Sequence, residues 1–203
     1  MAYHTFKMDV LQEKFGIQTN HSEDYFALVP PIAINPILQA HLDKYVPLGI
    51  AMGSEKARSE LIVTPVLLEV LELCSQKISL FSGVEFNPDP KRGLKGTCDY
   101  LIALSPEQFT VTDPVVALVE AKKDDIRNGI AQCIAEMIGA QVFNEKRGKS
   151  LDTIFGVVTT GTNWLFLRLK GKIVYVENTE YYIHQVEKVI AIILKMLEES
   201  AQN

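Results

Sequence analysis

The sequence predicts an α/β fold with a mixed central sheet flanked by helices, and three observations support it. Residues 115–123 (Val-Val-Ala-Leu-Val-Glu-Ala-Lys-Lys) begin as a continuous apolar run, which is typical of a strand buried on both faces. Two further strand-like runs, 78–86 and 96–104, precede it in the chain. Segments with helical apolar spacing lie before and after these three runs, which favours a sheet covered by helices.

Length and composition indicate one globular domain or a domain with an N-terminal addition. The chain has 203 residues, 47% of them hydrophobic, which is enough to build a core. We therefore divide it into an N-terminal accessory segment, residues 1–53, packed on a core domain, residues 54–203. The net charge of -5 excludes a protein that is held on DNA by its overall charge. Any contact with nucleic acid must use a local basic patch.

The accessory segment is the least regular part of the sequence. Phe6, Val10 and Phe15 have loosely helical spacing and predict a short helix within residues 1–20. Four prolines then lie scattered among apolar positions, and they predict an irregular segment with one turn of helix around residues 37–45.

The core domain begins with a predicted helix. Ser54 is suited to be its N-cap, with an acidic residue in the first turn, and apolar positions recur at intervals of three and four as far as Leu73. Pro65 either kinks this helix or starts a second helix capped by Thr64. The apolar stripe is expected to face the core.

The remaining elements follow in a clear order. The runs 78–86 and 96–104 are expected to form an antiparallel pair across a turn-rich loop, and 115–123 is the third strand. Asp124 and Asp125 then cap a helix that ends near Asn144. The last elements are a three-strand meander and a closing helix, over residues 153–160, 164–169, 173–176 and 184–197.

Charged residues gather where two of these strands meet. Side chains alternate along a strand, so Glu120 and Lys122 point to one side and Ala121 to the other. Asp99 is the one acidic residue at the start of the run 96–104. If the two strands are neighbours, Asp99 lies beside Glu120 and Lys122.

An acidic residue, an interval of about twenty residues and then acid-x-Lys is a pattern that resembles the PD-(D/E)xK nucleases. The resemblance extends from roughly residue 54 to residue 170 and rests on the order of elements as well as on Asp99, Glu120 and Lys122. One departure is Cys98, which stands where many members carry proline. The stretch Gly-Val-Val-Thr-Thr-Gly-Thr-Asn-Trp, residues 156–164, also resembles the strand that follows the catalytic helix in restriction-subunit-type nuclease domains.

The resemblance implies a restriction endonuclease-like αβββαβ core, with a β-hairpin extension and a C-terminal helix. It implies an enzyme, a metal-dependent nuclease that hydrolyses phosphodiester bonds of DNA, in restriction, defence or repair. The alternative is a catalytically inactive module with the same fold that binds nucleic acid or assembles a complex. The complete acid and lysine set favours the enzyme, whereas the acidic net charge favours the module.

The resemblance also assigns roles to individual residues. Asp99 and Glu120 would be carboxylate ligands of Mg²⁺ or Mn²⁺, and the backbone carbonyl of Ala121 would complete the protein's share of the ligands. Lys122 would orient the attacking water or stabilise charge on the phosphate. A salt-bridge cluster at a sheet edge is the structural alternative for these residues, and such pairs add little stability.

Two helical residues complete the expected site. Glu60 matches the acid that faces the metal from the first core helix, and Glu55 is its competitor for that role. Gln132 matches the polar helix residue near the reacting phosphate, and Glu136, one turn later, is placed to hold it.

Other features of the sequence indicate the cellular compartment of the protein. The three cysteines are far apart and embedded in apolar runs, which predicts buried thiols in a reducing compartment. The N-terminus lacks the pattern of a secretory signal, and no apolar run is long enough to span a bilayer. We therefore expect a cytoplasmic protein with no membrane contact. Its choice between DNA and RNA and its state as monomer, homodimer or subunit of a complex stay open.

Overall fold

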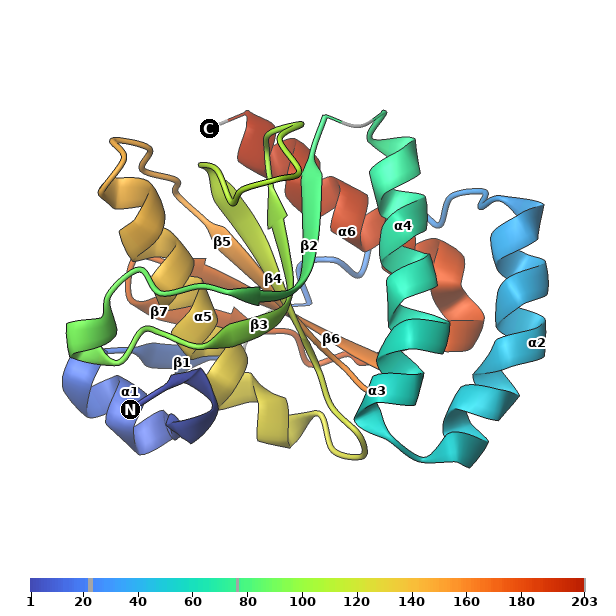
Figure 1. Ribbon diagram of the computed structural model, residues 1–203, viewed down its shortest axis with the longest axis horizontal. Coiled ribbons are helices and arrows are strands. Elements are labelled where there is room, and N and C mark those ends of the chain that lie inside the picture. Colours follow the sequence, from blue (N-terminus) through green and yellow to red (C-terminus); the bar gives the residue numbers. More distant parts are fainter. Residues whose placement is uncertain (22–23, 76, 203) are drawn as a thin grey trace.

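The computed structural model describes residues 1–21, 24–75 and 77–202 and has the predicted α/β class. The N-terminal segment 1–53 contains two positions, 22 and 23, that lie outside these ranges. The described strands form one mixed sheet of eight, in the order β1-β7-β6-β5-β4-β3-β2, with β8 paired to β6 (Figure 1). Their bounds are β1 Gln18–Asn20, β2 Ser79–Glu85, β3 Thr97–Ala103, β4 Val115–Ala121, β5 Ile154–Thr159, β6 Asn163–Lys170, β7 Ile173–Val176 and β8 Tyr181–Tyr182.

Helices cover both faces of the sheet, and the sheet separates the core into two apolar layers (Figure 1). Helix α5 packs on β4 and β5 from one side, and α4 and α6 pack together on the other. The α-helices are α1 Met8–Phe15, α2 Pro36–Met52, α3 Glu55–Arg58, α4 Thr64–Leu73, α5 Arg127–Glu145 and α6 Val186–Ala201. Short 3-10 turns occupy Tyr3–Thr5, Pro90–Arg92 and Ile183–Gln185, and a π-helical turn occupies Ser59–Val63.

The predicted pairing of the strands is confirmed. β2, β3 and β4 are successive antiparallel neighbours, and β5, β6 and β7 form the expected antiparallel meander. β4 and β5 are parallel because α5 connects them across one face. All seven residues of β4 are buried, as expected of an apolar run between two helical layers.

The accessory segment is more regular than its prolines suggest. The single turn predicted around residues 37–45 is wrong, because α2 runs for 17 residues with Pro47 inside it. Asn35 caps the first turn through its side chain, and Gly53 ends the helix in the left-handed conformation. Burial of Leu38 and Leu42 against the helix 55–73 compensates for the backbone hydrogen bond that proline cannot make.

The first core helix is continuous rather than kinked or split at Pro65. Ser54 caps it as predicted, with its hydroxyl 3.1 Å from the Ala57 nitrogen. The π-helical turn Ser59–Val63 widens the helix just before Pro65, which removes the need for the missing proline N–H. The predicted cap by Thr64 is wrong, since the Thr64 hydroxyl bonds instead to the Tyr100 hydroxyl at 2.8 Å.

Helix α5 is fixed at both ends by polar side chains. Asp125 accepts from the Arg127 nitrogen at 2.9 Å, but the N-cap position itself is Ile126 and makes no side-chain capping bond, so the predicted cap is displaced by one residue. At the other end Asn144 accepts from the Val115 nitrogen at 2.9 Å and donates to the Val115 oxygen at 2.7 Å. These two bonds fix the end of α5 to the first residue of β4.

Replacement of Asn144 by alanine is expected to lower the free energy of unfolding by about 2 kcal/mol, because both backbone groups of the buried Val115 lose their partner. Urea denaturation would measure the change. Asn128→Ala is the matched control, since Asn128 is exposed in the first turn of the same helix. Equal midpoints for the two variants would contradict a structural role for Asn144.

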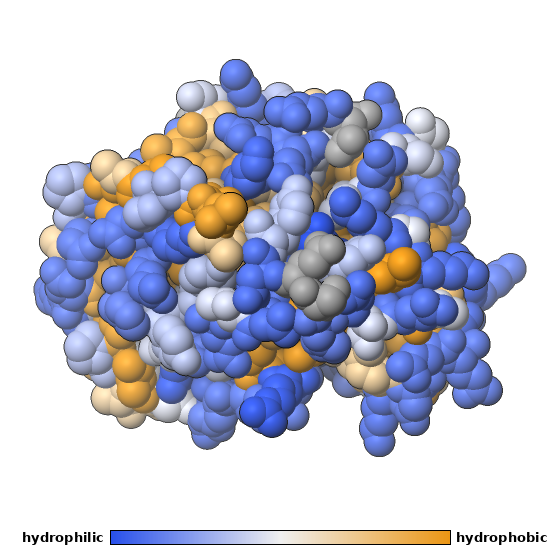
Figure 2. Space-filling model, turned by 180° about the vertical axis from the view of Figure 1, so that it is seen from behind, coloured by the Kyte–Doolittle hydropathy of each residue, from blue (hydrophilic) through white to orange (hydrophobic). Residues whose placement is uncertain are grey.

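The surface in Figure 2 is mostly hydrophilic, and the cysteine thiols are buried or half-buried. The face seen in Figure 2 is mostly hydrophilic, with hydrophobic side chains in separate patches. All three cysteines are free thiols; Cys98 and Cys133 are buried and Cys74 is half-buried. Within the described ranges, the helices are all too short or too polar to cross a membrane.

Candidate functional site

The candidate site lies at the end of the sheet where β3 begins and β4 ends. The antiparallel register pairs Tyr100 with Val119, so the residues that flank this pair, Asp99 and Glu120, come from adjacent strands. The Asp99 carboxylate accepts a hydrogen bond from the Ala121 nitrogen at 2.9 Å. The predicted meeting of the two strands is therefore confirmed.

Glu120 is the centre of the cluster. Its carboxylate is 1% exposed and forms an ion pair with the Lys122 ammonium through Oε1. The other oxygen, Oε2, accepts from the Gln132 side-chain nitrogen at 2.8 Å. Lys122 also donates to the Gln132 side-chain oxygen at 3.3 Å, so these three side chains form a closed ring of contacts.

Gln132 connects this ring to a second buried carboxylate. Its side-chain nitrogen also donates to Glu136 Oε1 at 3.2 Å, which confirms the contact predicted one turn along the helix. Glu136 is fully buried, and its Oε2 has no hydrogen-bond partner among the described residues. A buried polar atom without a partner costs about 1–3 kcal/mol.

Burial and mutual repulsion raise the pKa values of the three carboxyl groups. Burial, and secondly the charge of Asp99, raises the pKa of Glu120 to about 7 in spite of Lys122. Burial also raises the pKa of Asp99, against the opposing effects of the Ala121 N–H and Lys122. Burial and the charge of Glu120 raise the pKa of Glu136 well above its ordinary value. The carboxyl groups of this site therefore hold their protons more tightly than free carboxyl groups do.

The neighbouring carboxylates also raise the pKa of Lys122, and for an ammonium group a raised pKa favours the charged form. Burial alone would lower its pKa, but the carboxylates of Glu120, Glu55 and Asp99 outweigh burial, and the pKa lies above its ordinary value. Lys122 is thus a fixed positive charge at neutral pH. Such a group can stabilise anionic oxygen but does not act as a base.

Close packing of α5 on the sheet brings Gln132 to the cluster. A Cβ at Gly129 would lie 2.6 Å from Val158 Cγ1 and 3.1 Å from Lys122 Cγ, which are impossible or very tight distances. Only glycine lets the helix approach this near. The small residues noted in the helix thus serve the site as well as the fold.

The structure does not bring Glu60 into this cluster. Glu60 lies in the π-helical turn Ser59–Val63, and its exposed carboxylate pairs with Lys56 at 3.0 Å. Of the two helical acids it is Glu55, the competitor from the same helical segment, that adds to the effect of Glu120 in raising the pKa of Lys122. The widened turn changes which helical residues face the sheet, and apolar periodicity alone does not reveal it.

The donor set fits a divalent metal with few protein ligands. Nowhere in residues 1–21, 24–75 and 77–202 do three or more His, Cys, Asp or Glu side chains converge as a metal-binding group. The carboxylates of Asp99 and Glu120 with the carbonyl of Ala121 are a set that suits Mg²⁺, which retains several waters in proteins. A divalent cation would replace the protons that the raised pKa values keep on Asp99 and Glu120. Each engaged oxygen of Glu120 keeps a further lone pair for it.

A polar pocket of about 380 Å³ adjoins the cluster at the residue after Lys122. Lys123, Arg127 and Arg58 contribute positive charge, and three carboxylates balance it. Arg58 donates to the Thr160 carbonyl at 3.0 Å, and its buried Nε has no partner in the described part of the chain. The pocket is therefore a hydrophilic extension of the site.

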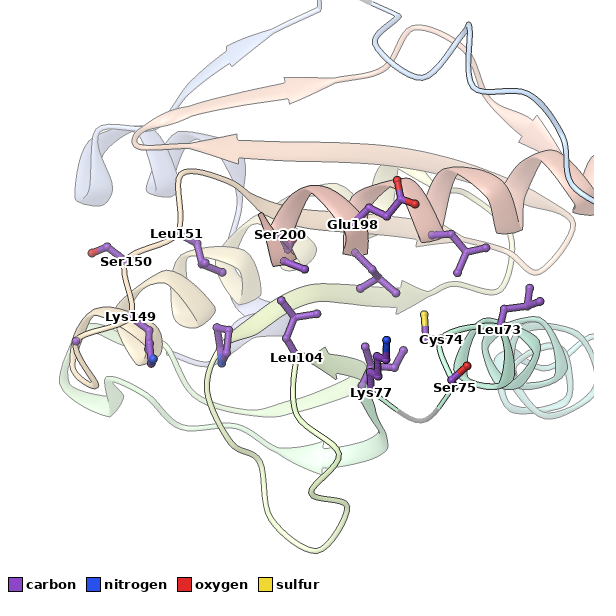
Figure 3. Close-up of a pocket in the computed structure, with 16 residues that line it drawn as sticks. Leu73, Cys74, Ser75, Lys77, Leu104, Lys149, Ser150, Leu151, Glu198 and Ser200 are labelled. Atoms are coloured by element: carbon purple, nitrogen blue, oxygen red, sulfur yellow. The ribbon is translucent and has the colours of Figure 1, made fainter. Parts of the chain in front are cut away.

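A larger cavity, about 920 Å³, lies at the other end of the same strands (Figure 3). Leu104, which follows β3, and Pro114, which precedes β4, line it together with the ends of α4 and α6. Figure 3 shows Leu104 and Leu151 facing the cavity, with Lys77 and Lys149 near it. It contains none of the predicted site residues.

Three features of the site are not apparent from residue patterns. The complete burial of Glu136, the lining role of Arg58 and the position of Glu55 depend on how α5, the π-helical turn and β4 pack together. The spacing of Gln132 and Glu136 was the one available signal. A search against known protein families and a search of characterised proteins both find no match for this chain.

Proposed function

We propose that the protein is a metal-dependent nuclease of the PD-(D/E)xK type that hydrolyses phosphodiester bonds of DNA. One observation carries the proposal: Glu120, Lys122 and Gln132 form one contact network, and Asp99 on the neighbouring strand accepts from the Ala121 N–H, between Glu120 and Lys122 in the chain. The element order of one helix, three strands, one helix and one strand, residues 55–159, supports the restriction endonuclease-like core.

Each side chain has a distinct task in this proposal. Lys122 presents a permanent positive charge that stabilises the phosphate as negative charge builds on its oxygens. Gln132 holds Glu120 and Lys122 in a fixed relation by bonding to both. The Ala121 N–H orients the Asp99 carboxylate. Such orientation before the reaction is what lowers the barrier.

Asp99, Glu120 and the carbonyl of Ala121 would hold the metal, Mg²⁺ or Mn²⁺. When bound, the metal supplies a nucleophile at neutral pH and charge stabilisation for the phosphate. The chain's part is to hold the two carboxyl groups on adjacent strands, where the metal would replace their protons. Gln132 and Lys122 assist by bonding to the ionised form of Glu120.

The polar pocket beside Lys122 supports nucleic acid as the substrate class. Arg58, Lys123 and Arg127 line this pocket, where each can contact a phosphate oxygen, although the acidic residues of the same lining balance their charge. The buried thiols support a reducing, cytoplasmic setting. We leave open whether a second copy or another subunit adds to the substrate surface.

The alternative is a catalytically inactive module that keeps the fold and binds nucleic acid or assembles a complex. Two observations favour it. Both oxygens of Glu120 are already engaged by Lys122 and Gln132, and acidic residues balance the basic ones in the adjoining pocket. In this reading the cluster is a buried ion pair that adds specificity to the fold more than stability.

Cleavage assays separate the two functions. We expect the protein to cut at least one member of a panel of closed circular, linear, single-stranded and branched DNA when Mg²⁺ or Mn²⁺ is present. Asp99→Asn is expected to reduce the rate by at least about 100-fold, because it removes one charged ligand. Activity without added metal, or equal activity in Asp99→Asn, would overturn the nuclease proposal.

A further inference from the structure

Tyr3 is a buried side chain that reaches the back of the candidate site from the N-terminal segment. It is 1% exposed, and its N–H donates to the Lys95 carbonyl at 3.0 Å. A Cβ at Gly96 would lie 3.1 Å from the Tyr3 ring, and a Cβ at Gly139 would lie 2.5 Å from the Tyr3 hydroxyl oxygen. The tyrosine thus occupies space that exists only because both positions are glycine.

The position of Gly139 shows where the hydroxyl group lies. Gly139 is in the middle of α5, where glycine disfavours a helix, so the close approach of Tyr3 accounts for its presence. It follows Glu136 by three residues and therefore lies on the same side of the helix. Burial, then the charges of Cys98 and Glu136, raises the pKa of Tyr3, as expected of a phenol near this buried carboxyl group.

Two buried oxygens in this region have complementary chemistry. The Tyr3 hydroxyl and Glu136 Oε2 both have no hydrogen-bond partner among the described residues. A phenol donates, whereas a carboxylate oxygen accepts. Buried polar atoms in proteins are normally satisfied, by protein groups or by an internal water.

We propose that Tyr3 is a positioning residue for the candidate site, joined to Glu136 Oε2 through one internal water. With Oε2 held in this way, Glu136 Oε1 stays directed at Gln132, which in turn bonds to Glu120 and Lys122. The catalytic consequence rests on the proposed nuclease function, but the contact between Tyr3 and Glu136 does not.

Tyr3→Phe in the full chain tests the proposal, because it removes the hydroxyl and keeps the ring. We expect a lower midpoint of urea unfolding, displaced NMR signals of the Gln132 side-chain amide, and a kcat about 3- to 10-fold lower with KM unchanged. The Gln132 signals are assigned by their loss in Gln132→Leu. Tyr182→Phe, at a tyrosine that is 44% exposed, is expected to leave all three measurements unchanged.

A second variant tests whether the two side chains act together. Glu136→Gln keeps the size of the side chain, and in this background Tyr3→Phe should cause a smaller further change in the unfolding midpoint. Additive effects of the two substitutions would overturn the proposal. The proposal would also be overturned if Tyr3→Phe were as stable as the wild type or more stable and the Gln132 signals did not move. That result would mean that the Tyr3 hydroxyl has no partner, because removal of a buried hydroxyl without a partner does not destabilise a protein.

The outcome for Tyr3 can be distinguished from the outcome for the nuclease function. If the wild-type protein cuts no DNA with either metal, the proposed function fails, and the unfolding and NMR measurements still decide whether Tyr3 holds Glu136. If the wild-type protein cuts and Tyr3→Phe keeps its kcat, the positioning role fails while the nuclease function stands.

Discussion

Lys122→Ala is expected to abolish metal-dependent cleavage, with a loss of at least about 100- to 1,000-fold in kcat. The reason is that Lys122 is the one ammonium in contact with Glu120 and Gln132 in the described structure, and its raised pKa keeps it charged. A single group that stabilises developing charge in a buried site is commonly worth this much. The measurement is the initial rate on the DNA that the wild-type protein cuts best.

The control for this prediction is Lys170→Ala. Lys170 is exposed at the far end of β6, so its loss changes the net charge equally without touching the cluster. A thermal unfolding curve would show that Lys122→Ala protein is folded, because loss of the ion pair also destabilises the buried Glu120. Cleavage that persists in Lys122→Ala protein would point to a contaminating nuclease or to a different active site.

The stability of the metal-free protein is expected to fall as the pH rises from about 5 to about 7. The pKa of Glu120 is raised from 4.5 to about 7 in the folded protein, so between these values the folded state binds more protons than the unfolded state. Stability therefore decreases with pH across that window, by an amount on the order of 3 kcal/mol. The raised pKa of Glu136 acts in the same direction.

Millimolar Mg²⁺ is expected to oppose this loss at pH 8 and to have little effect near pH 5. A cation that binds Asp99 and Glu120 in their ionised forms stabilises only the folded state, and only when those forms are populated. Urea denaturation at several pH values, with Mg²⁺ or a chelator, measures both effects. Glu120→Gln is the matched variant, and it should flatten the pH dependence and remove the response to Mg²⁺.

Two results would contradict the predicted electrostatics. One is stability that rises between pH 5 and pH 7 in the metal-free protein, which would mean that the carboxyl groups are ionised at little cost in the folded state. The other is an equal response to Mg²⁺ in wild-type protein and in Glu120→Gln, which would place the bound cation elsewhere.

The strands that build the site could be predicted because they are governed by local rules. The apolar run of β4 has one way to be buried on both faces, and alternation then places Glu120 and Lys122 together. The position of Asp99 beside Glu120 was predicted on the condition that their strands are neighbours, and the register of β3 and β4 meets that condition. The contact of Gln132 with Glu136 followed from helical spacing.

The errors arose where tertiary contacts override local preference. Prolines predicted an irregular segment, but α2 tolerates Pro47 because its buried face packs on the first core helix. Glu60 was placed at the site by the resemblance, as an acid of the first core helix, but it lies in the π-helical turn and its carboxylate is exposed. The approach of Tyr3 to α5 joins residues that are more than 130 positions apart in sequence, and no local pattern contains it.

The parallel pairing of β1 with β7 has a consequence for the order in which the chain is completed during synthesis. Residues 18–20 leave the ribosome early, but their partners, residues 173–175, are made roughly 150 residues later. At typical rates of translation this delay is on the order of 10 to 30 s. During that time other parts of the N-terminal segment can already dock, since Tyr3 bonds to Lys95 and α2 packs on the helix 55–73. The sheet edge beyond β7 is therefore closed last, by the part of the chain that was made first.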